Sequence, residues 1–202
     1  MALLLIRHGE TDLNAARVVQ FPETPLGENG IRQAAQLAQG LSGRPLDMVL
    51  TSDYERARMT AGAVASAAGI TLRESPALRE RNFGELRGQA YDDLTHVDIF
   101  GPEYAPPGGE SWPVFHARVD RAWAEILELS GKLAGDLAVV THGLVLRSLL
   151  ERVLDVGGHE ISPDLVVANT SVTEVAGEPP WSVLRLADTS HLSEVAHQGG
   201  AV

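Results

Sequence analysis

The chain of 202 residues is 44% hydrophobic, so it can bury a full core, and its length favours one domain over two. With 27 acidic and 16 basic residues, its net charge of −11 would repel nucleic acid and anionic membranes, so an anionic ligand needs a local cationic pocket. The absence of cysteine excludes disulfides, thiolate catalysis and cysteine metal sites. The apolar run at residues 2–6 is too short for a signal peptide or a membrane span, and we expect a soluble cytoplasmic protein.

Short apolar runs alternate along the chain with stretches that carry apolar residues at helical spacing. Near-continuous apolar runs are typical of strands buried on both faces of a parallel sheet, with helices as crossovers. The expected elements, in chain order, are a strand at 2–6, a helix at 31–41, a strand at 47–50, helices at 54–68 and 112–129, a strand at 136–140, a helix at 144–154, and strands at 166–175 and 181–186. This order predicts an α/β fold, a three-layer α/β/α sandwich with a mostly parallel central sheet.

The helix expected at 54–68 has a start signal, because residues 52–55, Ser-Asp-Tyr-Glu, fit a capping box led by Ser52. Arg56 lies one turn into this helix. Helical side chains lean back toward the N-terminus of their helix, so Arg56 is expected to point toward the end of the preceding strand.

Two segments lack the pattern of a regular element. Residues 95–113 are rich in glycine and proline, which predicts a loop, and we expect a lid over about 89–113. Residues 196–202 have no core-facing pattern and are expected to be a disordered tail behind a single domain at 1–195.

Polar residues follow three of the predicted strands at their carboxyl ends: His8, Ser52 and His142. Ligands of open parallel sheets bind at this edge, so the three should converge there with Arg7 and Arg56. Two histidines, two arginines and helix N-termini suit a phosphate group. The sequence has no nucleotide-binding glycine motif and no convincing metal-ligand spacing, so we expect neither a bound nucleotide cofactor nor a metal.

Ordered motifs along the chain resemble those of a known family. Residues 5–11, Leu-Ile-Arg-His-Gly-Glu-Thr, followed by Asn14, resemble the signature of the histidine phosphatase superfamily, which includes the phosphoglycerate mutase-like enzymes. Matching segments follow in order at 24–27, 51–57, 78–85, 109–111, 139–143 and 169–171. Because the resemblance spans nearly the whole chain, it implies a phosphoglycerate mutase-like fold and an enzyme that transfers phosphoryl groups.

The resemblance also implies how the phosphoryl group is held. His8 would be the nucleophile and form a phosphohistidine, with its other ring nitrogen fixed by a backbone carbonyl. Arg7, Arg56 and His142 would clamp the phosphoryl group, with His142 at least partly protonated. The other residues expected to bind phosphate are Asn14, Thr24 and Gly143.

The implied proton donor to the leaving oxygen is Glu80, which would later deprotonate the attacking water. Glu85 and Glu110 lie in neighbouring motifs and stay open as alternatives. Among the remaining basic residues, Arg58 is expected to face away from the site, Arg79 and Arg81 are left open, and the other histidines, His116 included, are expected to be structural or exposed.

Within the family, the choice between phosphatase and mutase depends on the lid. Residues 89–113 contain no lysine or arginine and five carboxylates, which would repel a bisphosphate, so the sequence favours a cofactor-independent, metal-independent phosphatase. Its substrate would be a small phosphorylated metabolite with a neutral or weakly charged leaving group. A cofactor-dependent phosphoglycerate mutase, an α-ribazole-type phosphatase and a non-catalytic phosphate-binding module remain alternatives, and a homodimer stays open.

Overall fold

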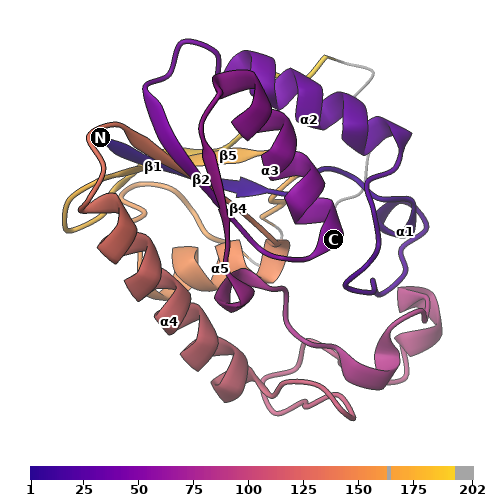
Figure 1. The fold of residues 1–202 in the computed structure, drawn as a ribbon. Coiled ribbons are helices and arrows are strands. Elements are labelled where there is room, and N and C mark those ends of the chain that lie inside the picture. The colour runs from indigo at the N-terminus through magenta and orange to yellow at the C-terminus, as the bar shows by residue number, and fades with distance from the viewer. Residues whose placement is uncertain (163–164, 194–202) are drawn as a thin grey trace.

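The computed structural model describes residues 1–162 and 165–193, which form a six-stranded sheet between two layers of helices (Figure 1). The strands are β1 (Ala2–Arg7), β2 (Leu46–Thr51), β3 (Thr71–Glu74), β4 (Asp136–Thr141), β5 (Val172–Ala176) and β6 (Val183–Asp188). Their order across the sheet is β3-β2-β4-β1-β5-β6, with parallel pairing from β3 to β1 and antiparallel pairing of β1 with β5 and of β5 with β6. The predicted three-layer sandwich with a mostly parallel sheet is therefore confirmed.

Each face of the sheet is covered by a pair of helices (Figure 1). One pair is α2 (Glu28–Gly40) and α3 (Glu55–Ala68), and the other is α4 (Trp112–Ser130) and α5 (Gly143–Arg152). The connections contain the short helix α1 (Asp12–Ala15) and three 3-10 turns, η1 (Pro76–Leu78), η2 (Gly84–Leu86) and η3 (Tyr91–Leu94). None of the helices in the described residues is long and apolar enough to span a bilayer.

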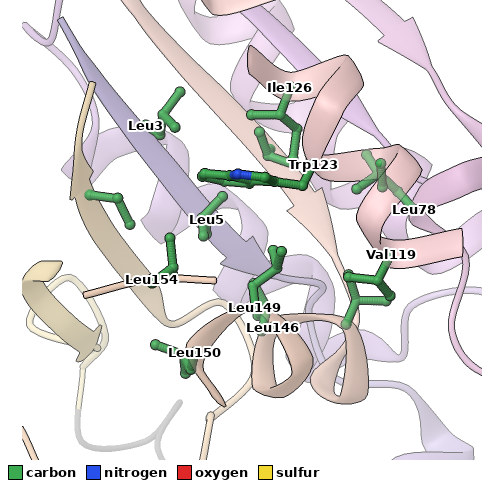
Figure 2. Close-up of a cluster of buried hydrophobic side chains, with 14 of the residues drawn as sticks. Leu3, Leu5, Leu78, Val119, Trp123, Ile126, Leu146, Leu149, Leu150 and Leu154 are labelled. Atoms are coloured by element: carbon green, nitrogen blue, oxygen red, sulfur yellow. The ribbon is translucent and has the colours of Figure 1, made fainter. Parts of the chain in front are cut away.

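The continuous apolar run of β1 contributes buried side chains to the hydrophobic clusters on both faces of the sheet. Successive strand side chains point to opposite faces, so Leu3 and Leu5 join the cluster under α4 and α5, while Leu4 and Ile6 join the cluster under α2 and α3. Figure 2 shows Leu3 and Leu5 on the side that faces Trp123 of α4. This two-sided burial holds the end of β1 rigidly in the middle of the sheet.

Several predicted boundaries were wrong for identifiable reasons. Helix α3 begins at Glu55 with Tyr54 as its N-cap, and no side chain caps it, because the Ser52 hydroxyl accepts the Tyr54 N–H at 3.3 Å and lies 2.8 Å from His142 Nε2, short of the first turn. Strand β5 begins at Val172 rather than 166, since Thr170 adopts a positive φ of 57° that interrupts an extended strand. The short strand β3 was not predicted, because it is an edge strand with mostly exposed side chains.

The predicted lid, residues 89–113, consists of η3 and a series of turns, and one buried arginine fastens it. Arg81 donates from Nη1 to Ile99 O at 3.1 Å, from Nη2 to Tyr104 O at 2.6 Å and from Nε to Glu110 O at 3.0 Å. Its guanidinium also lies 4.0 Å from the ring centroid of Trp112. The lid is thus held down from the residue next to Glu80. The predicted tail at 196–202 lies outside the described residues.

Candidate functional site

The carboxyl ends of β1, β4 and β2 bring the predicted polar residues together. Arg7 pairs with Thr141 in the parallel β1–β4 register, so the next residues, His8 and His142, lie side by side with ring centroids 5.1 Å apart. Strand β2 lies on the other side of β4 and places Ser52 Oγ 2.8 Å from His142 Nε2. Beside this edge lies a cavity of about 790 Å³. Its lining includes six of the eight predicted site residues: Arg7, His8, Asn14, Arg56, Glu80 and Gly143.

His8 has the geometry of a nitrogen nucleophile. Its side chain is buried, and Nδ1 lies 2.7 Å from Gly9 O, a distance that assigns the proton to Nδ1 and leaves the lone pair on Nε2. The carbonyl acceptor expected for this ring is thus Gly9 O. Burial, followed by the charges of Arg56 and Arg7, lowers the pKa of His8 well below its ordinary value. The imidazole is therefore neutral and unprotonated at Nε2 at pH 7.

Two buried guanidinium groups flank this imidazole. Arg7 donates from Nη1 to Val167 O at 2.7 Å, whereas no acceptor for its buried Nε is present among the described residues. Arg56 donates from Nε to His8 Nε2 at 3.2 Å and from Nη1 to Phe21 O at 3.0 Å. Burial lowers the pKa of Arg56 to about 10, so the group keeps its charge at pH 7. Buried cations with unsatisfied donors are the features of an anion site.

Glu80 faces the same cavity from the segment after η1. Its Oε1 accepts the Arg81 backbone N–H at 2.9 Å and its Oε2 accepts that of Leu144 at 3.2 Å. Burial raises the pKa of Glu80, against the opposing effects of these N–H groups and of Arg56 and Arg7. The carboxyl group therefore stays protonated to a higher pH than an exposed glutamate, as a proton donor requires.

The alternative acids are placed differently. Glu110 forms an ion pair with Arg118 at 2.7 Å and accepts the Asn82 N–H at 2.9 Å, with its side chain 15% exposed. Glu85 lies in the turn η2 and is not part of the cavity lining. Of the three carboxylates, Glu80 is the one that the fold brings to the cavity.

Two predicted site residues, His142 and Thr24, are not part of the cavity lining. The His142 ring is fully buried, and its Nδ1 has no hydrogen-bond partner in the described part of the chain. Burial, followed by the charges of Arg56 and of the other site groups, lowers the pKa of His142 well below its ordinary value. The His142 ring is thus neutral at pH 7, and its partial protonation beside a bound phosphate stays a prediction. The Thr24 hydroxyl accepts the Phe21 N–H at 3.2 Å and steadies the loop whose carbonyl binds Arg56.

Asn14 and the remaining arginines have separate surroundings. Asn14 lines the cavity, while its Oδ1 and backbone N–H complete a capping box with Thr11 at the start of α1. Arg79 pairs with Asp53 near the surface, and Arg58 pairs with Glu55 and Glu74, away from the cavity as expected.

The far wall of the cavity was predicted only in part, because the lid was expected to set specificity through its acidic and aromatic residues, whereas the contribution of α5 and of His116 was not. This wall is formed by Trp112 and His116 of α4, by Leu144, Arg147, Ser148 and Glu151 of α5, and by Tyr91 and Phe100 of the lid. The expectation that His116 is structural or exposed overlooked this placement. The spacing of three and four residues within α4 and α5 was the available signal, but a stripe at this spacing is equally typical of a core-facing helix side.

The described residues contain no group of three or more histidine, aspartate or glutamate side chains that could hold a metal ion. The cations that face the cavity near His8 are the guanidinium groups of Arg7 and Arg56.

Comparisons with known proteins show which sequences and folds this chain resembles. The sequence profile of the histidine phosphatase superfamily (branch 1) matches residues 3–189. A Yersinia pestis protein named "Probable phosphoglycerate mutase" is 34% identical over 207 residues, covering 95% of each chain. Among solved structures, a mycobacterial glucosyl-3-phosphoglycerate phosphatase in complex with VO3 has a TM-score of 0.73 at 27% identity, covering 87% of this chain and 90% of that one. A phosphoglycerate mutase from Bacillus anthracis has a TM-score of 0.79 at 26% identity, covering 95% and 94%.

Proposed function

Because this chain belongs to the histidine phosphatase superfamily, we propose that it hydrolyses small phosphomonoesters without a metal, through a phosphohistidine on His8. The observation that carries the proposal is the state of the His8 ring. Its Nδ1 is fixed by Gly9 O, and its Nε2 accepts from the buried Arg56 with the charge of the buried Arg7 nearby. Such a ring is a ready nucleophile toward an anionic electrophile.

In the first half-reaction, the phosphoryl group of the substrate takes over the N–H donors of Arg56 Nε and Arg7 Nε. His8 Nε2 then attacks phosphorus, the ester P–O bond breaks, and Glu80 donates its proton to the leaving alkoxide. Positioned charge does most of the work in phosphoryl transfer, and here two guanidinium groups supply it. A neutral His142 can stabilise the same charge by donating a hydrogen bond if its proton is on Nδ1.

In the second half-reaction, the Glu80 carboxylate removes a proton from a water molecule, which attacks phosphorus. The P–N bond breaks, inorganic phosphate leaves, and both His8 and Glu80 return to their starting protonation states. Water accepts the phosphoryl group only if the site does not bind a second alcohol at the position of the attacking water. The binding of such an alcohol is what separates a mutase from a phosphatase.

The composition of the lid supports hydrolysis over transfer. The lid segment 89–113 has no basic residue, and the far-wall Arg147 pairs with Glu151 at 2.7 Å. The lid itself therefore offers little to a bisphosphate. Arg87 also lines the cavity, where it donates to Tyr54 Oη at 3.3 Å and forms no ion pair within the described residues, so it is a cation that a second phosphate group could contact. The alternative, a phosphoglycerate mutase, is favoured by the names of the Yersinia and Bacillus relatives.

The test measures release of phosphate from p-nitrophenyl phosphate by chelator-treated enzyme, together with acid-labile phosphorylation of the protein. We expect both for the wild type and neither for His8→Ala, while His159→Ala, a change at an exposed histidine, retains both. Interconversion of 3- and 2-phosphoglycerate that depends on 2,3-bisphosphoglycerate would establish the mutase instead. Phosphate binding without labelling of His8 would indicate a non-catalytic module.

A further inference from the structure

One face of α5 lines the cavity along its whole length. The lining residues Gly143, Leu144, Arg147, Ser148 and Glu151 are spaced at one, three, one and three residues, which places them in a single helical stripe. Figure 2 shows the other side of this helix, with Leu146, Leu149 and Leu150 pointing into the core. The stripe is thus available to a ligand, because the apolar side of the helix is already packed.

The stripe begins beside the phosphoryl site. A Cβ placed on Gly143 would lie 3.7 Å from Arg7 Nε and 4.0 Å from Glu80 Oε2. Glu151 is eight residues further along, and a helix rises about 1.5 Å per residue, so the cavity extends about 12 Å from the phosphoryl end. A volume of about 790 Å³ lies in the range of pockets that hold drug-sized ligands. This space is much more than a three-carbon phosphate ester occupies.

The wall opposite the stripe is aromatic and rigid. The Trp112 ring is held by Arg81 on one face and donates from Nε1 to Gly101 O at 2.8 Å. It stacks on His116, one turn further along α4, with ring centroids 5.5 Å apart and planes inclined by 22°. In the lid, the rings of Tyr91 and Phe100 stack with centroids 6.2 Å apart. Trp112 is already packed against Arg81 and His116, so the rings that a planar or ring-shaped group can contact are those of His116, Tyr91 and Phe100.

The far end of the cavity is polar but carries no net charge. Arg147 is paired with Glu151, and its Nη2 also donates to Ser162 O at 3.0 Å. His116 Nδ1 lies 3.0 Å from Ser148 Oγ, and burial lowers the pKa of His116, so its ring is neutral at pH 7. Hydroxyl and imidazole groups here offer hydrogen bonds, whereas an anion would meet Glu151 as well as Arg147.

From these observations we infer a leaving-group site along α5. It takes phosphomonoesters whose alcohol part is an uncharged, ring-bearing group of about 10 Å, with hydrogen-bonding atoms at its far end. The inference rests on the proposed function, since it assigns the alcohol side of the same ester. It separates the preferred substrate from short, charged esters such as phosphoglycerate.

The first experiment compares kcat/KM for three primary alkyl phosphates with the same scissile bond: glycerol 3-phosphate, ribose 5-phosphate and a nucleoside 5′-monophosphate. We expect the nucleoside monophosphate to exceed glycerol 3-phosphate by at least about tenfold, as one or two added hydrogen bonds and a ring contact would give. Ser148→Leu, which fills the far end, should reduce this ratio about tenfold. Equal kcat/KM across the series, or a ratio unchanged in Ser148→Leu, overturns the inference.

The second experiment tests the charge of the far end without changing its size. It compares 4-carbamoylphenyl phosphate with 4-carboxyphenyl phosphate, and we expect the wild type to favour the uncharged carbamoyl ester. Glu151→Gln removes the negative charge from this end of the cavity and should shift the preference several-fold toward the carboxylate. The matched control is Glu128→Gln, which breaks another pair spaced four residues apart, that with Lys132, on the surface of α4. A wild-type preference for the carboxylate, or the same shift in the control, contradicts the inference.

Different results would refute the proposed function and the leaving-group site. Failure to hydrolyse any ester, p-nitrophenyl phosphate included, would refute the proposed function and the leaving-group site with it. Rapid hydrolysis of p-nitrophenyl phosphate without discrimination among the longer esters would refute the leaving-group site alone.

Discussion

The substitution Glu80→Gln separates the chemical role of this residue from its structural role. Both carboxyl oxygens accept a backbone N–H, from Arg81 at 2.9 Å and from Leu144 at 3.2 Å. Glutamine keeps one acceptor and turns an NH₂ group toward the other donor, which leaves a buried N–H unsatisfied at a cost of about 1–3 kcal/mol. For a domain of this size each kcal/mol lowers Tm by about 2–4 °C, so the expected loss is about 2–12 °C.

The kinetic effect depends on the leaving group. Loss of a positioned proton donor should lower kcat/KM for an alkyl phosphate about 10²- to 10⁴-fold. The effect on p-nitrophenyl phosphate should be much smaller, because nitrophenolate leaves without a proton. Since burial raises the pKa of Glu80, wild-type activity on the alkyl ester should fall as the pH rises through that pKa, and this fall should be absent in the variant.

The assay measures both esters from pH 4.5 to 8.5, beside a thermal denaturation curve. Glu110→Gln is the control, because it disturbs the ion pair with Arg118 outside the cavity and should lower Tm without changing the ratio between the two esters. An equal loss on both esters in Glu80→Gln, or a preserved fall of activity with pH, would refute the assignment of Glu80 as the acid.

Two further predictions concern stability. The pKa values of His8 and His142 are lowered in the folded state, so below pH 6.5 the unfolded chain binds protons that the folded chain does not. The free energy of unfolding should therefore decrease as the pH falls from 6.5 to 5, by up to about 1.4 kcal/mol per pH unit for each histidine, partly offset by the raised pKa of Glu80. Urea titrations across this range would contradict the argument if stability stayed constant or rose on acidification. Separately, Arg118→Met leaves the largely buried carboxylate of Glu110 without its partner and removes the hydrogen bonds to the carbonyl groups of residues 77, 79 and 80. Together these losses should cost about 3–5 kcal/mol, seen as a Tm lower by about 6–20 °C. Arg121→Met, at an exposed position on the same helix, should change Tm little, and a similar small change in Arg118→Met would disprove the role of the ion pair.

The sequence predicted the parts of the site that depend on strand ends. The apolar runs before His8 and His142 place both residues at the same edge, because parallel strands share their direction. The partner of the Ser52 hydroxyl could not be predicted. Residues 52–55 fit a capping box, but the same serine can instead bind a histidine that is distant in the sequence. The choice depends on β4, which lies about ninety residues away along the chain.

The lid and the far wall depend on contacts that no local pattern encodes. Arg81 fastens the lid through carbonyl groups 18 and 23 residues away, and a carbonyl acceptor leaves no mark on the side-chain sequence. The basic and acidic residues of α5 were visible in the sequence, but their pairing and their position against His116 required the packing of two helices. The pairing of opposite charges in the far wall therefore depends on tertiary packing.

The contact between Arg56 and His8 determines which electrophiles react with His8. The guanidinium Nε–H occupies the lone pair of His8 Nε2, so the resting nucleophile is covered. An uncharged acyl or alkyl electrophile brings no group that can replace the imidazole as the hydrogen-bond partner of Arg56. The lone pair of His8 Nε2 therefore stays engaged in the hydrogen bond with Arg56. A phosphate dianion attracts the guanidinium and exposes the nitrogen as it arrives. The negative charge of a phosphate ester is thus what displaces Arg56 from His8 Nε2 and makes the imidazole reactive. Neutral histidine-modifying reagents should therefore react with His8 slowly, in spite of its lowered pKa.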